Sequence, residues 1–163
     1  MANYTVRRAT LADAEALIRH RIRMFEDMGV LGTSDREVEQ LEAAFGAWLA
    51  EHMPGDTYVA WVVEEVNAGK GGSIVAGGGA TIIPWPPGPR YPGTQVAFVY
   101  NVYTEPEHRG RGLARRVMDE VHTFCRHAGI GSVALTASTF GQPLYESMGY
   151  HVTRSPMMFL SLD

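Results

Sequence analysis

The chain has 163 residues, of which 45% are hydrophobic and 20% charged, so it is long enough for one folded domain with a substantial core and short for two. Its formal net charge is −4, from 14 Lys and Arg against 18 Asp and Glu, and an acidic chain is a poor candidate for a nucleic-acid-binding protein. The longest apolar run, YVAWVV, is far shorter than the roughly 20 residues that cross a bilayer, and the N-terminus lacks a signal-peptide pattern. We therefore expect a single domain over residues 1–163, in the cytoplasm, with no membrane or nucleic-acid partner.

The hydrophobic pattern switches between strand and helix periods along the chain. Capping pairs mark the starts of the first two helices, at Thr10 with Asp13 and at Ser34 with Glu37. In chain order, the pattern predicts a strand at 4–9, helices at 10–29 and 34–54, strands at 57–66, 74–83 and 94–104, a helix at 113–129, a strand at 132–138, a short helix at 143–149, and one or two final strands in YHVTRSPMMFLSL. The strand–helix–strand unit at 94–138 predicts a right-handed crossover with parallel strands, inside a mixed sheet. The fold class is α/β.

Several conspicuous residues have a structural explanation that we weigh against a functional one. Cys125 lies on an apolar helix face, which favours a core residue over a reactive thiol. Glycines 77–79 inside a strand indicate either a bulge, a close approach by another backbone or ligand, or simple packing of small residues. The Pro-rich loop at 84–93 favours a stiff segment near a substrate mouth over a ligand for a Pro-binding module. The six histidines are never spaced i, i+4 from one another, and with one cysteine they predict no metal site.

The stretch EHRGRGLARR, residues 107–116, places two glycines and four arginines at the start of a predicted helix. The N-terminal end of a helix carries a partial positive charge, so arginines there are unfavourable unless an anion is bound. Amides at that end have no partner within the helix, and glycines let a phosphate approach them. The stretch lacks the third glycine of the dinucleotide-binding fingerprint, because Arg115 takes its place. A small phosphate ligand, a solvated basic turn and a nucleic-acid contact all remain open at this point.

Two motifs resemble those of the GNAT N-acetyltransferases. VYTEPEHRGRGLARRVM resembles motif A, whose signature is Arg or Gln-x-x-Gly-x-Gly or Ala, and PLYESMGY resembles the second landmark of the family, a Leu-Tyr shortly before a Gly-aromatic pair. The opening RRATLADAEAL, the helical pair and the order of elements are similar to a GNAT protein from end to end. This resemblance implies a single-domain α/β (α+β) GNAT fold. We expect a mixed, twisted sheet of six or seven strands, about four helices and a splayed parallel strand pair.

The resemblance also implies a cofactor site for acetyl-CoA. The pyrophosphate is expected on the amides of the signature loop, namely Arg109, Gly110, Arg111, Gly112, Leu113, Ala114 and Arg115. Pantetheine is expected to pair with the preceding strand, with amides of Val102, Tyr103 and Thr104 bonding the thioester carbonyl. Ser138 stands where many relatives have an Asn that contacts the cofactor.

Tyr145 matches the family tyrosine beside the sulfur of CoA, where a phenol can protonate the departing thiolate; packing in the core is its other interpretation. A general base is harder to assign, because the strand begins with Gln95 where some relatives have Glu. Glu26 and Asp27 either line the acceptor side or are solvated charges at a helix end, and we favour the second. Deprotonation through water needs no single base, and Asn101 and Tyr103 are candidates for orienting the acceptor.

The function implied by the resemblance is that of an acyltransferase, EC 2.3.1. It moves an acetyl group from acetyl-CoA to a primary amine of a small molecule or peptide, by direct attack in a ternary complex. The alternative is a non-catalytic domain that binds CoA or acetyl-CoA as a sensor. The acceptor is not identified, although the acidic balance fits a cationic amine. A homodimer through the C-terminal strands is a further expectation from the family.

Overall fold

The computed structural model describes residues 3–32, 34–67, 70–89, 91–155 and 157–162. The elements are β1 (Asn3–Arg8), α1 (Ala14–Asp27), α2 (Asp35–His52), β2 (Tyr58–Asn67), β3 (Lys70–Pro84), β4 (Gln95–Thr104), α3 (Leu113–His127), β5 (Val133–Leu135) and α4 (Gln142–Ser147), with short 3-10 turns at Leu11–Asp13 and Pro106–His108. Across these ranges, no helix is long and apolar enough to cross a membrane.

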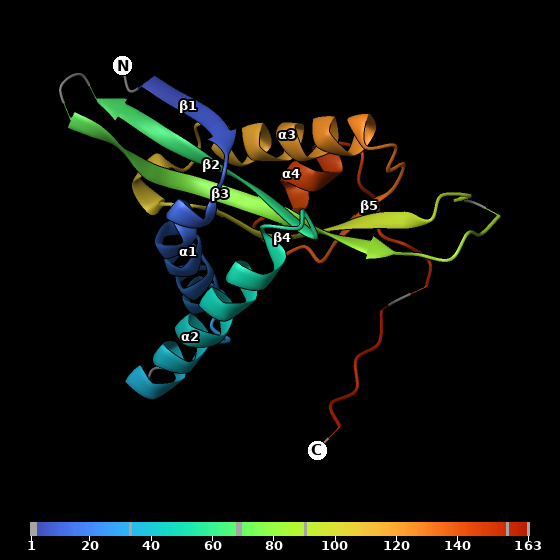
Figure 1. The fold of residues 1–163 in the computed structure, drawn as a ribbon, viewed down its shortest axis with the longest axis horizontal. Coiled ribbons are helices and arrows are strands. Elements are labelled where there is room, and N and C mark those ends of the chain that lie inside the picture. Colours follow the sequence, from blue (N-terminus) through green and yellow to red (C-terminus); the bar gives the residue numbers. More distant parts are fainter. Residues whose placement is uncertain (1–2, 33, 68–69, 90, 156, 163) are drawn as a thin grey trace.

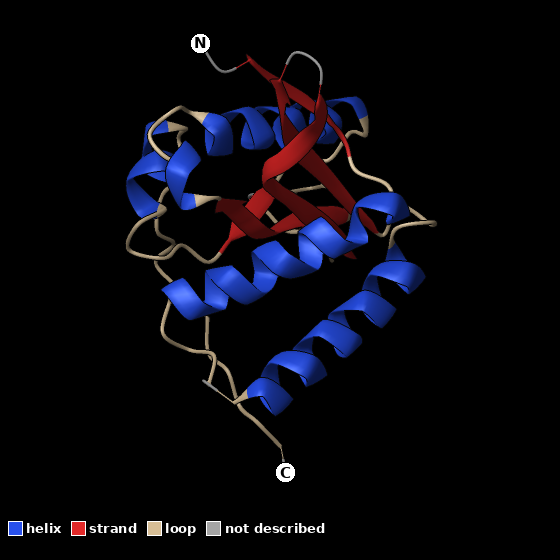
Figure 2. Ribbon diagram, turned by 90° about the vertical axis from the view of Figure 1, so that its left-hand side faces the viewer, coloured by secondary structure: helices blue, strands red, loops and turns tan. Residues whose placement is uncertain are grey.

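The five strands form one sheet in the order β1-β2-β3-β4-β5. Neighbours from β1 to β4 are antiparallel, and β4 and β5 are parallel, as expected for the crossover through α3. Helix α3 lies across one face of the sheet, and α1 and α2 lie on the opposite face (Figures 1 and 2). The chain is therefore layered helix–sheet–helix.

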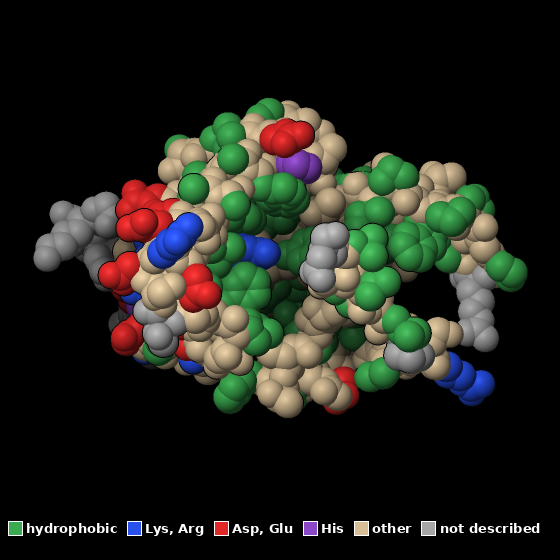
Figure 3. All heavy atoms as spheres, turned by 90° about the horizontal axis from the view of Figure 1, so that it is seen from below, with side chains coloured by type: hydrophobic (Ala, Val, Ile, Leu, Met, Phe, Trp, Pro, Cys, Tyr) green, Lys and Arg blue, Asp and Glu red, His purple; other side chains and the backbone are tan. Residues whose placement is uncertain are grey.

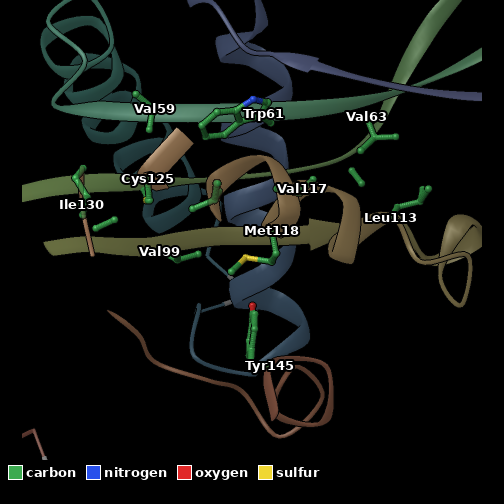
Figure 4. Close-up of a cluster of buried hydrophobic side chains, with 14 of the residues drawn as sticks. Val59, Trp61, Val63, Val99, Leu113, Val117, Met118, Cys125, Ile130 and Tyr145 are labelled. Atoms are coloured by element: carbon green, nitrogen blue, oxygen red, sulfur yellow. The ribbon is translucent and has the colours of Figure 1, made fainter. Parts of the chain in front are cut away.

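Alternate residues of β2 supply the two hydrophobic cores. Val59, Trp61 and Val63 face α3, and the residues between them face α1 and α2. Successive side chains of a strand point to opposite faces, so a strand covered on both sides reads as a continuous apolar run. This explains YVAWVV without a membrane. Figure 4 shows the core under α3, which also contains Cys125.

Two capping pairs position the helices below the sheet as the sequence predicts. The Thr10 amide donates to Asp13 Oδ2 at 2.8 Å, and the Glu37 amide donates to Ser34 Oγ at 3.3 Å. Asp13 also accepts two hydrogen bonds from the Arg7 guanidinium, at 2.7 and 2.8 Å, and these bonds hold the pKa of its carboxyl below the ordinary value. The start of α1 is thereby fastened to β1.

The prediction of six or seven strands is wrong, because the described chain has five. Residues 151–155 and 157–162 form no strand, and their apolar side chains are exposed, among them Met158, Phe159 and Leu162 at about 90%. The sheet ends at β5, which has three residues and so presents few free backbone groups to a further strand. The prediction failed because a strand needs a partner edge as well as a β-prone sequence.

The glycine run at 77–79 marks a close approach, as one of the predicted alternatives had it. A Cβ at Gly78 would lie 3.0 Å from Val102 Cγ2, and one at Gly79 would lie 2.5 Å from the Val59 carbonyl oxygen and 2.6 Å from the Tyr58 hydroxyl. The register also shifts here, because Gly77 faces Tyr103 while Gly79 faces Tyr100. Two residues of β4 therefore lie opposite one of β3, which is a β-bulge.

Candidate active site

The bulge in β4 lies where this strand separates from β5. Only Ala97–Val99 pair with β5, so beyond Val99 the described chain places no strand on that edge of β4. Asn101 has φ of +59°, a left-handed conformation that Asn tolerates better than most residues. The predicted splayed strand pair is thus present, and Val102, Tyr103 and Thr104 lie along its free edge.

The loop between β4 and α3 presents a run of unpaired amides. The Arg109 amide donates to the Pro106 carbonyl and the Arg116 amide donates to the Gly112 carbonyl, but the six amides of residues 110–115 find no acceptor in the described part of the chain. Gly110 and Gly112 both have φ of +74°, and a Cβ on either would meet nothing within 4 Å. Six free donors beside open space are what a phosphate group requires, so the residues present fit a pyrophosphate.

The arginines of this loop differ in what they do. The Arg109 side chain donates to the Thr104 carbonyl at 2.9 Å and to Asp27 at 2.5 Å, so it fastens the loop to β4 and to the end of α1. Arg115 donates to Ser147 Oγ at 2.5 Å and links α3 to α4. Arg111 contacts no carboxylate in the ranges described, and its side chain makes one long bond to a backbone oxygen. The loop therefore keeps a positive charge beside its free amides.

Tyr145 lies at the junction of α4, α3 and the sheet. Its side chain is 9% exposed and belongs to the same core as Leu113 of the loop and Val102 of β4. Figure 4 shows its hydroxyl directed toward Met118 of α3. Burial raises the pKa of the Tyr145 hydroxyl above its ordinary value, so the group is protonated at neutral pH. Its packing in the core is thus shown, and its protonated hydroxyl is compatible with the predicted role of proton donor.

Ser138 closes the turn that starts α4. Its hydroxyl accepts from the Gly141 amide at 3.2 Å, and its carbonyl accepts from the amides of Gly141 and Gln142. A Cβ at Gly141 would lie 2.9 Å from the Tyr145 ring, so the turn is pressed against that tyrosine. The structure thus gives Ser138 a part in positioning Tyr145.

The two acidic residues at the end of α1 lie in different surroundings. Asp27 pairs with Arg109, as described above, while Glu26 lines an open groove with Glu15, Ile22 and Glu42 on α1 and α2. Neither is a free carboxylate beside β4. The buried acidic side chains in the described ranges are Asp13 and Glu105, and both are bonded to arginines. Each buried carboxylate of the described chain is therefore already paired with an arginine.

A buried ionic cluster at the end of β4 escaped the sequence interpretation. Glu105 accepts from Arg19 and from Arg23 of α1, and His20 Nε2 lies 3.4 Å from the same carboxylate. His20 is 1% exposed, and burial lowers its pKa to about 4, so the ring is neutral at neutral pH. The one local signal was the polar His20 in line with Leu17 on the buried face of α1. In the described chain, no group of three or more His, Cys, Asp or Glu is arranged to hold a metal ion.

A second polar cluster surrounds Asn101. Its side-chain oxygen accepts a hydrogen bond from Arg21 of α1, and its amide donates to the Tyr58 hydroxyl at 3.4 Å. The sequence predicted that Asn101 would orient the acceptor amine. It did not predict Arg21 and Tyr58 at this position, because they lie 80 and 43 residues away from Asn101 in the sequence.

Comparison with known proteins identifies the family. The model of the acetyltransferase (GNAT) family matches residues 16–150. A GCN5-related N-acetyltransferase from Ralstonia eutropha JMP134 is 28% identical, with a TM-score of 0.81 over 97% of this chain and 99% of that one. A predicted acetyltransferase from Clostridium acetobutylicum, solved with acetyl-CoA, is 26% identical, with a TM-score of 0.81 over 100% and 96%. Glucosamine-6-phosphate N-acetyltransferase from Arabidopsis thaliana, 22% identical with a TM-score of 0.68 over 99% of both chains, shares the fold. No curated protein matched the chain. The chain belongs to the acetyltransferase (GNAT) family.

Proposed function

We propose that this chain transfers an acetyl group from acetyl-CoA to the nitrogen of an amine, by direct attack in a ternary complex. The observation that carries the proposal is the run of six unpaired amides at residues 110–115, which lies between the free edge of β4 and the start of α3. Acetyl-CoA supplies the activated acetyl thioester.

The signature loop would hold the pyrophosphate through these amides, with Arg111 adding positive charge. Val102, Tyr103 and Thr104 on the free edge of β4 would bond the pantetheine arm and the thioester carbonyl. Each of these elements is rigid: β4 is paired to β3 on its other edge, and the Arg109 side chain anchors Thr104. Donors that are already in place need no reorganisation when charge develops on the carbonyl oxygen.

Tyr145 would give its proton to the departing thiolate. Its raised pKa keeps the proton on the hydroxyl until the sulfur becomes basic, and general acid assistance of this kind is typically worth 10²–10⁴-fold in rate. Ser138 and the Arg115–Ser147 bond would position α4, and with it the tyrosine.

The test has two stages. Thermal unfolding is first measured with and without saturating CoA and acetyl-CoA, since a ligand at 100 times its Kd adds about 2.7 kcal/mol of stability. Thiol release is then followed over a panel of amines for the wild type and for Tyr145→Phe. An enzyme of the proposed kind shows the thermal shift, and its Tyr145→Phe variant keeps the shift while kcat falls at least tenfold. A protein that shows no shift at millimolar CoA does not have the proposed function.

A further inference from the structure

Arg21 carries a positive charge that the protein does not neutralise. Helix α1 has three arginines, and two of them, Arg19 and Arg23, contact Glu105. Arg21 is within 4 Å of no carboxylate in the ranges that the structure describes. Its guanidinium is partly buried, and this burial lowers the pKa of Arg21. The direction of the shift reflects the desolvation cost of a charge at this position.

The side chain is held so that one nitrogen of the guanidinium, Nη2, makes no bond within the described chain. Nη1 donates to Asn101, and the group lies 4.8 Å and 4.7 Å from the ring centroids of Phe25 and Phe45. Nε is fully buried and has no partner, and no bond is made by Nη2, as far as the chain is described. Because Nε is enclosed by the protein, a ligand meets the guanidinium at Nη2, whose N–H groups can donate to a carboxylate oxygen.

The Arg21 guanidinium lies at the acceptor side of the proposed transfer site. Asn101, the partner of Arg21, is the bulge residue where β4 leaves β5, and it directly precedes Val102 on the free edge. Tyr58 and Tyr100 also lie near this guanidinium; Tyr58 is buried and its hydroxyl accepts from Asn101, while Tyr100 is partly exposed. Figure 3 views the molecule from the side on which α1 and α2 lie and shows a hollow with hydrophobic side chains and a Lys or Arg side chain inside it.

We propose that the acceptor amine carries a carboxylate, which Arg21 receives through Nη2. One unpaired guanidinium balances a single negative charge, and the partly exposed rings of Phe25 and Tyr100 beside it suit an acceptor with an apolar body. Amino acids of apolar side chain are the simplest molecules of this class. A polycationic acceptor without an acidic group would instead meet the charge of Arg21. This proposal rests on the proposed function, because it names the substrate class of the same site.

The experiment compares amines that differ only in the charge of the second group. Phenylalanine and leucine are paired with their carboxamides, β- and γ-amino acids test the spacing, and an amino sugar phosphate and a polyamine complete the panel. Thiol release gives kcat/KM for each. The amine of a carboxamide is the less basic of each pair and so is more often uncharged, which means that a preference for the acid reports recognition.

The wild type is expected to prefer the carboxylates by about tenfold to a hundredfold, the range that loss of a charged hydrogen bond produces. Arg21→Gln removes this preference, while Arg126→Gln, an exposed arginine in the last turn of α3, keeps it. Arg21→Lys keeps the positive charge without the planar guanidinium, so its preference for carboxylates over carboxamides should be intermediate. This variant tests the proposal if Arg21→Gln does not fold. The thermal shift with CoA stays unchanged in all three variants.

Equal or faster acetylation of the carboxamides, the polyamine or the phosphate overturns the carboxylate proposal, as does a preference that survives Arg21→Gln. If no amine is acetylated, calorimetric titration of the amino acids into the CoA complex decides. Absence of binding there overturns the proposal for Arg21 and leaves CoA binding standing. Absence of the CoA shift itself is the separate failure of the proposed function.

Discussion

Replacing Gly112 tests whether the start of α3 binds an anion. Gly112 has φ of +74°, and a Cβ there meets no atom within 4 Å, so Gly112→Ala strains the backbone without a steric clash. Placing an L-residue in this conformation costs about 1–2 kcal/mol. For a chain of this length, each kcal/mol lowers Tm by about 2–4 °C. Gly112→Glu has the same backbone cost and adds a carboxylate beside the six free amides.

Gly129, after the other end of the same helix, provides a matched control. Its φ is +71°, and a Cβ there also meets nothing within 4 Å. Gly129→Ala should therefore lose about as much stability as Gly112→Ala, within the 1–2 kcal/mol range of such a change. Any difference between the two positions in the response to CoA then reports the local function of the loop.

The assay is thermal unfolding of each variant with and without CoA, with the shift measured from its own ligand-free Tm. We expect the full shift for the wild type and Gly129→Ala, a smaller one for Gly112→Ala, and none for Gly112→Glu, because like charges repel at the amide cradle. If Gly112→Glu keeps the full shift, CoA binds elsewhere, and the assignment of residues 110–115 is refuted.

Three further changes test the supporting structure by urea unfolding. Burial lowers the pKa of His20 to about 4, so between about pH 6.5 and pH 4 the unfolded chain takes up a proton that the folded chain does not. The free energy of unfolding therefore falls by up to about 3 kcal/mol over this window. His20→Phe should reduce this loss, and an unchanged pH dependence would exclude His20 as its source. Asp13→Asn should cost about 1–3 kcal/mol, because it removes the charge that accepts two of the Arg7 hydrogen bonds and leaves only Glu64 to pair with Arg7. A loss below 0.5 kcal/mol, on the order of a typical surface substitution, would contradict this. Gly79→Ala should destabilise the fold by at least about 1–3 kcal/mol, the usual cost of overpacking, because its Cβ would lie 2.6 Å from the Tyr58 hydroxyl. A neutral result would mean that β2 and β3 separate easily.

The sequence predicts the local elements well where their signals are local. Capping residues, the glycines of positive φ and the apolar stripes lie within a few positions of the helix ends that they mark. The strand at 132–138 shows where this fails, because β5 extends only over Val133–Leu135. Leu135 pairs with Val99, the last residue before β4 turns away, so β5 ends where its partner departs. The bulge that causes this depends on the register of β3 and β4, which no local pattern reveals.

The unpaired amides of the signature loop were predictable because they follow from local features, namely two glycines and the start of a helix. The side chains of the loop were not, since their partners lie far away in the sequence. Arg109 has the same local surroundings as Arg111, yet Arg109 is bonded to Asp27, 82 residues earlier, and Arg111 is not. Which arginine remains free to meet a ligand is decided by the tertiary contacts.

The same reasoning applies to α1 and explains how an unpaired charge comes to lie at the acceptor side. Arg19 and Arg23 are four residues apart and share one face of the helix, while Arg21 lies roughly 160–200° away from them around the axis. Glu105 binds the first two, and the neutral ring of His20 is buried against Tyr103 of β4, so the helix has one rotational setting on the sheet. That setting turns Arg21 toward Asn101. The ion pairs of the buried Glu105 thus do more than stabilise the end of β4, because they fix the orientation of the one guanidinium that they do not neutralise.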